Sequence, residues 1–177
     1  MGWKFGVHES PAYTVWGDSK WAEIFQYDVY LNIGKPTDAE RLKTRNMAQS
    51  DNFPVAGTMC FKNWFYPIYT NYGKSKVLVN YFKLLSIHFP QKTISSGVEY
   101  TRRMNLGEFI HFFSGASGVN LKDQATLAFG WTPATDAQFT QARQVFPDVR
   151  INKLIDLSGA LNLQNMRTQT VHLTGLF

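Results

Sequence analysis

Apolar residues recur every three or four positions through most of this chain, a spacing that places them on one face of an α-helix. Residues 76–88 show the spacing most clearly, because Val77, Tyr81 and Leu84 fall on one stripe. Pro90, which cannot continue a helix, follows two residues later. The pattern therefore predicts a helix with one buried face.

Capping residues delimit further helices along the chain. Thr37 and Glu40 have the spacing of a capping box, in which each side chain bonds the other residue's backbone N–H. Asn105 and Glu108 have the same spacing, and Thr132 precedes a proline in the way that helix starts often do. The helices predicted in this way span residues 18–34, 36–50, 58–72, 76–88, 120–130 and 132–147, and one more begins at Asn105 and ends at Gly115 or at Gly118.

The pattern changes near the C-terminus. Apolar and polar residues alternate between residues 149 and 155 and again around His172, which favours strands. We therefore expect a mainly α fold, a multi-helix orthogonal array with a small C-terminal β element, although an α+β fold also fits. Residues 1–147 would form a helical lobe, and residues 148–177 would form a C-terminal β segment or begin a neighbouring domain.

Aromatic residues crowd the segment 58–72, which includes Trp64, Phe65 and Tyr66. Such a crowd is typical either of a sugar-binding platform or of a core, and its helical spacing favours the core. The chain has 177 residues, of which 44% are hydrophobic. This is enough for one main domain with a real core.

The charge excess of the chain is small. Lys and Arg number 18 against 13 acidic residues, which gives a net charge of +5. The basic residues are scattered, and the nearest approaches to clusters are the segment 41–45 and Arg102-Arg103. No nucleic-acid-binding motif accompanies them, so a solvated surface is favoured and a nucleic-acid partner is not expected, with polyanion binding kept as a third hypothesis.

Cys60 is the only cysteine, so the chain has neither an internal disulfide nor a paired-cysteine metal site, and its apolar neighbours predict a buried thiol. No apolar stretch is long enough to cross a bilayer, and the first residues lack the pattern of a signal peptide. Because Met1-Gly2 lies close to the motif at His8, we expect an excised piece of a longer chain. The compartment stays undecided, and the protein would be secreted if an export signal preceded this piece.

The candidate chemistry lies near the N-terminus, where His8 and Glu9 precede Glu23 in an amphipathic segment. In thermolysin-like zinc proteases two histidines one turn apart bind the metal, the glutamate between them polarises water, and a later glutamate completes the site. Here Ala12 holds the place of the second histidine, and Pro11 predicts a helix that starts only after the dipeptide. The motif thus keeps two metal ligands, His8 and Glu23, and is one ligand short of an ordinary catalytic zinc site.

Two other histidines, His88 and His111, lie on predicted helices near apolar faces. Either could replace the missing ligand, although a hydrogen-bonded structural histidine is the commoner arrangement. The sequence contains no phosphate-binding glycine loop, dinucleotide fingerprint or serine-nucleophile elbow. Zinc is therefore the one cofactor to which the residues point.

The order of these segments resembles the C-terminal helical lobe of gluzincin metallopeptidases, particularly enhancin-type enzymes. The resemblance covers residues 6–147 and is carried by His8-Glu9, Trp21-Ala22-Glu23, the aromatic helix at 64–66, the helix at 77–89, and the later segments 105–109, 117–122 and 129–131. It implies that His8 and Glu23 would bind zinc and that Glu9 would be the general base.

The chain departs from this family at Ala12 and lacks the substrate-binding strands that the family places upstream. Two explanations fit, an incomplete piece of a larger protein or a degenerate descendant that binds without cutting, and both predict little peptidase activity alone. We therefore expect a degenerate or partial zinc-metallopeptidase-like domain that acts on or binds a protein or glycoprotein. The alternative is a non-enzymatic helical module that binds protein or carbohydrate.

Overall fold

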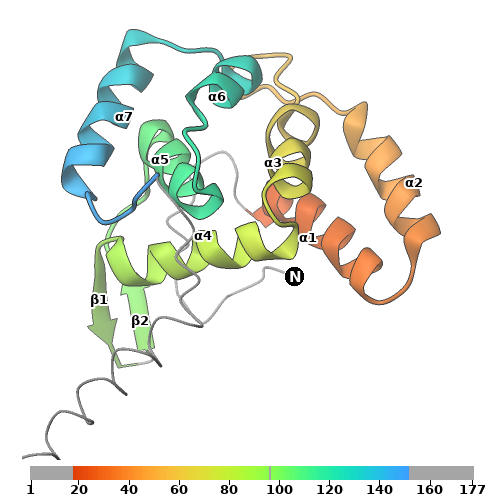
Figure 1. Cartoon of the computed structure of the whole chain (residues 1–177), viewed down its shortest axis with the longest axis horizontal. Coiled ribbons are helices and arrows are strands. Elements are labelled where there is room, and N and C mark those ends of the chain that lie inside the picture. The colour runs from red at the N-terminus through yellow and green to blue at the C-terminus, as the bar shows by residue number, and fades with distance from the viewer. Residues whose placement is uncertain (1–17, 96, 152–177) are drawn as a thin grey trace, which may run out of the picture.

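The computed structural model of the chain describes residues 18–95 and 97–151 (Figure 1). Within them lie seven α-helices, a π-helical segment and one hairpin, and the predicted mainly α fold is confirmed. No helix in these two ranges combines the length and the apolar character that crossing a bilayer requires. In chain order the elements are α1 (Asp18–Asn32), α2 (Pro36–Met47), η1 (Phe61–Phe65), α3 (Tyr66–Asn71), α4 (Ser75–His88), β1 (Gln91–Ile94), β2 (Gly97–Tyr100), α5 (Leu106–Ser117), α6 (Lys122–Phe129) and α7 (Pro133–Val145).

Side-chain caps begin two of the helices where the sequence predicts them. Asn105 Oδ1 accepts a hydrogen bond from Glu108 N at 2.9 Å, and Glu108 Oε2 accepts one from Asn105 N at 2.9 Å, so the capping box of α5 is confirmed. Thr132 Oγ1 accepts from Thr135 N at 3.1 Å and caps α7. Gly118 ends α5 with φ 74°, a left-handed conformation that glycine adopts without a steric penalty.

Two other predicted caps are wrong. The N-cap of α2 is Lys35, which makes no side-chain cap bond, so Thr37 and Glu40 do not form a capping box. Pro36 provides the reason, because its fixed φ favours the first helical position and the helix therefore begins before Thr37. In α6 the N-cap is Leu121, one residue later than the predicted Asn120.

The hairpin β1–β2 was not predicted. Its strands are antiparallel, and Gln91 pairs with Tyr100 while Ile94 pairs with Gly97. Most of its residues are exposed, so the strands lack the apolar alternation that marks a half-buried strand. Of the predicted C-terminal β segment, residues 148–151 form turns and bends, and the remainder, 152–177, lies outside the described residues.

The core surrounds α5, which packs against both α4 and α7 (Figure 1). Phe113 of α5 has its ring 4.3 Å from that of Tyr81 and 5.6 Å from that of Trp21, with both pairs stacked. Trp64 meets Phe113 edge-on at 5.4 Å. The aromatic segment 58–72 is mainly core, as predicted, since five of its large apolar side chains are buried, namely those of Phe61, Trp64, Phe65, Ile68 and Tyr69.

Two glycines let neighbouring segments approach α5 closely. A Cβ at Gly107 would overlap the backbone N of Phe139 and the carbonyl carbon of Gln138 in α7. A Cβ at Gly115, two turns later, would lie 2.5 Å from Cγ1 of Val149. The close contact between α5, α7 and the segment after α7 therefore depends on the absence of side chains at these two positions.

We expect Gly107→Ala to lower the free energy of unfolding by about 3 kcal/mol, because the added methyl meets backbone that cannot rotate away. Urea unfolding followed by circular dichroism measures the change. Gly34→Ala is the matched control, since Gly34 has φ 72° but no atom of the described residues within 4 Å of an added Cβ, and it should cost about 1 kcal/mol for backbone strain alone. Equal losses in the two variants would contradict the close approach of α7.

Candidate functional site

Of the three predicted site residues, only Glu23 lies within the described part of the chain. His8 and Glu9, like Ala12 and Pro11, lie outside it. Glu23 is on α1, partly buried, and its Oε1 accepts a hydrogen bond from Lys20 Nζ at 2.9 Å. The carboxylate of the predicted distal metal ligand therefore has a cationic partner one turn away on its own helix.

Lys20 also binds a second carboxylate. Its Nζ lies 2.5 Å from Oδ1 of Asp51, in the loop between α2 and η1. Backbone bonds fix this loop, because Asp51 N donates to Thr58 O at 2.6 Å and Gly57 N donates to Asp51 O at 2.9 Å. The ammonium therefore bridges two carboxylates from separate parts of the fold.

Sequence reasoning missed two members of this cluster. The i, i+3 spacing of Lys20 and Glu23 on a predicted helix was a signal for the first pair. Asp51 gave no such signal, since its contact with Lys20 spans 31 positions and depends on the tertiary fold.

The cluster perturbs the protonation of both its helical members. Burial raises the pKa of Glu23 despite the opposing effect of Lys20, and the negative charge of Asp51 adds to the rise. Burial acts to lower the pKa of Lys20, but the hydrogen bonds to Asp51 and Glu23 outweigh it, so the pKa is raised. Lys20 thus stays cationic at neutral pH and can offer no lone pair to a metal.

No three His, Cys, Asp or Glu residues come close enough to hold a metal ion within residues 18–95 and 97–151. The two histidines considered as replacement ligands lie on different helices, His88 at the end of α4 and His111 in the middle of α5. Among the described residues neither belongs with Glu23 to a group of three or more possible ligands. Any three-ligand metal site that uses Glu23 would therefore need at least one ligand from outside the described residues.

His111 has the structural hydrogen bond expected of a buried histidine. Its Nε2 lies 3.1 Å from the carbonyl oxygen of Phe146, and because a carbonyl only accepts, Nε2 carries the hydrogen. The other nitrogen, Nδ1, is then a lone-pair acceptor, and it is buried without a hydrogen-bond partner among the described residues. Burial lowers the pKa of His111, the Phe146 bond opposes this, and the positive charge of Arg143 lowers it further.

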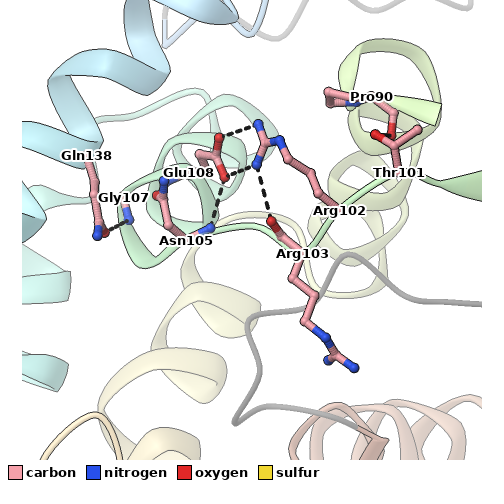
Figure 2. A network of polar contacts seen from close by, with 8 residues as sticks. All are labelled: Pro90, Thr101, Arg102, Arg103, Asn105, Gly107, Glu108 and Gln138. Carbon is pink, nitrogen blue, oxygen red and sulfur yellow. Dashed lines mark hydrogen bonds and ion pairs between the residues drawn. The ribbon is translucent and has the colours of Figure 1, made fainter.

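The basic pair Arg102-Arg103 is divided by the fold (Figure 2). The Arg102 guanidinium forms two hydrogen bonds to Glu108, at 2.7 and 2.9 Å, and lies 4.7 Å above the ring of Phe89. Arg103 directs its side chain away from this network. Arg102 therefore anchors the N-terminus of α5 and is not available to a polyanion.

The basic segment 41–45 is also partly compensated. Arg41 pairs with Asp38 at 2.8 Å, and Lys43 pairs with Glu40 at 2.6 Å, both along α2. Such exposed i, i+3 pairs stabilise little, but they reduce the local positive potential. The third hypothesis, polyanion binding, gains no continuous basic surface from α2.

We expect Lys20→Met to lower the free energy of unfolding by about 2 kcal/mol, because it leaves two partly buried carboxylates without their shared cation. Adding Glu23→Gln should restore part of the loss, since one of the two negative charges is then removed. Chemical denaturation at neutral pH measures both. Lys83→Met, on the exposed face of α4, is the matched control, and a loss equal to that of Lys20→Met would contradict the bridge.

We expect stability to fall on acidification partly because of His111. Its folded-state pKa lies below the ordinary value of 6.5, so below that value the unfolded chain takes up the proton first. The contribution of His111 is complete above pH 6.5 and is lost as pH falls toward the folded pKa. Urea unfolding at several pH values across this range measures the free energy of unfolding. This free energy should fall less steeply with decreasing pH for His111→Gln than for the unaltered chain, and an equal pH dependence in the two proteins would contradict the assignment.

Comparison with known proteins adds no relative to these observations. No protein-family model, no curated protein and no solved structure matches the chain. The resemblance to the gluzincin lobe therefore remains a prediction from the motif order. The case for a function depends on the residues of this chain and on the surfaces that the fold gives them.

Proposed function

We propose that this chain is a helical recognition domain, related to the C-terminal lobe of gluzincin metallopeptidases, that binds a protein or glycoprotein without metal catalysis of its own. The observation that carries the proposal is the Lys20 bridge between Glu23 and Asp51. A covalently tethered ammonium already neutralises the carboxylate that a zinc ion would need. The arrangement thus supports a structural role for Glu23 rather than a role as a metal ligand.

The electrostatic comparison supports this choice. A zinc ion bound by Glu23 would lie close to the ammonium of Lys20, and two cations at one carboxylate repel each other. Moving Lys20 away would break its contacts with both Glu23 and Asp51 and leave Asp51 partly buried without its cation. Zinc would have to compensate for both losses before it gained any net affinity.

The recognition surface that we favour lies on α1. Val29 and Ile33, at the end of α1 and directly after it, stand one turn apart and are 51% and 60% exposed. They follow the helix toward its turn into α2, and these two helices form one edge of the molecule (Figure 1). Aliphatic side chains grouped at an exposed edge are typical of a protein contact.

The competing function is a zinc-dependent peptidase lobe, with His8 and Glu23 as ligands and Glu9 as the base. It requires a third ligand in place of Ala12 and the departure of Lys20 from Glu23. This second requirement makes the two functions distinguishable, because Lys20 would compete with zinc in one and would stabilise the fold in the other.

We expect the purified full chain to contain no stoichiometric zinc and to show no shift in melting temperature when zinc is added. Metal content by plasma mass spectrometry and thermal unfolding, with and without a chelator, measure this for the unaltered chain and for His8→Ala, Glu23→Gln and Lys20→Met. Stoichiometric zinc that is lost in the first two variants and bound more tightly in Lys20→Met would overturn the proposal and make peptidase assays worthwhile.

A further inference from the structure

A cavity of about 450 Å³ opens where the chain leaves α7 and crosses α5. Its volume falls within the range of small-molecule sites. It lies away from Glu23 and from the α1 edge, so it is independent of the function proposed above. The described residues that line it are His111, Arg143, Pro147, Val149, Arg150 and Ile151.

The lining is positively charged and unbalanced. Among the described residues that form it, two are arginines and none is acidic. Arg143 makes no ion pair or hydrogen bond with the described residues, whereas Arg150 lies 3.9 Å from Asp148, with both side chains in solvent. One guanidinium is therefore uncompensated and the other is weakly compensated.

The charge of Arg143 acts on the buried histidine beside it. Its positive field helps to keep His111 neutral, and within the described part of the chain His111 Nδ1 has no hydrogen-bond partner. An anion placed at Arg143 would pair with this uncompensated guanidinium. The two arginines of the lining thus favour an anionic ligand over a cationic one.

The remaining residues of the lining are apolar, and the turn that carries them is held in place. Val149 is buried against Gly115 of α5, and its backbone N donates to the carbonyl oxygen of Phe146 at 3.1 Å. The same oxygen accepts from His111. Val149 itself is only 2% exposed, so the aliphatic surface beside the arginines comes mainly from Pro147 and Ile151, which flank this turn in the lining.

We propose that this cavity binds a monoanionic carboxylate with an aliphatic body, of the kind presented by the free C-terminus of a peptide that ends in a branched apolar residue. A single uncompensated guanidinium matches one carboxylate, which it can bind through two parallel hydrogen bonds. The aliphatic wall then takes the side chain, and the cavity volume suits a body of this size.

The test uses N-acetyl-leucine as the ligand and N-acetyl-leucinamide as its uncharged match, titrated into the full chain while the imidazole resonances are followed by NMR. We expect saturable binding of the acid, with a perturbed His111 signal, and at least tenfold weaker binding of the amide. Arg143→Gln should weaken binding of the acid about tenfold. Arg41→Gln, in α2 on the far side of the molecule from α7 (Figure 1), should change nothing.

Each opposite result overturns a part of the proposal. Equal affinity for acid and amide would show that the cavity does not recognise the carboxylate. Equal affinity for acetate and N-acetyl-leucine would show that it does not recognise the aliphatic body. No saturation by about 10 mM ligand would exclude the site itself, since that affinity is weaker than a built pocket provides. An unchanged affinity in Arg143→Gln, whose exposed side chain is not needed for folding, would exclude the assigned guanidinium.

Discussion

The burial of α5 on all sides is the constraint on which the rest of the structure depends. Every residue of this helix except Gly115 is buried. A helix surrounded in this way has no solvent-facing stripe for its polar residues, so each of them must find a partner inside the protein. Ser114 shows the solution, because its hydroxyl donates to Ile110 O at 2.7 Å and accepts from Leu121 N at 3.1 Å.

The polar residues of α5 therefore work as connectors. Glu108 ties its first turn to Arg102, which follows the hairpin, Ser114 ties its last turns to the start of α6, and His111 ties its middle to the end of α7. Buried acids and histidines of this kind are easily taken for catalytic groups. Their fixed partners show instead how a fully buried helix holds its neighbours.

The limits of prediction from this sequence follow from the range of each interaction. The caps at Asn105 and Thr132 were predictable because a cap is decided within three or four residues. The same local reasoning gave a wrong cap at α2, because Pro36 begins the helix before the box-like spacing of Thr37 and Glu40. The hairpin and the contact of Lys20 with Asp51 lay beyond this reasoning, since exposed strands carry little pattern and tertiary ion pairs carry none.

The placement of cations links the two polar regions of the molecule. At α1 the ammonium of Lys20 lies between two carboxylates, so positive charge is fully matched and the cluster acts as a bridge in the fold. After α7 the balance is reversed, because Arg143 and Arg150 line a cavity whose described residues include no acid. The ammonium of Lys20 is already paired with two carboxylates and has no charge free for an anionic ligand, whereas the guanidinium of Arg143 does. The same comparison directs the search for anionic ligands away from Glu23 and toward the cavity beside His111.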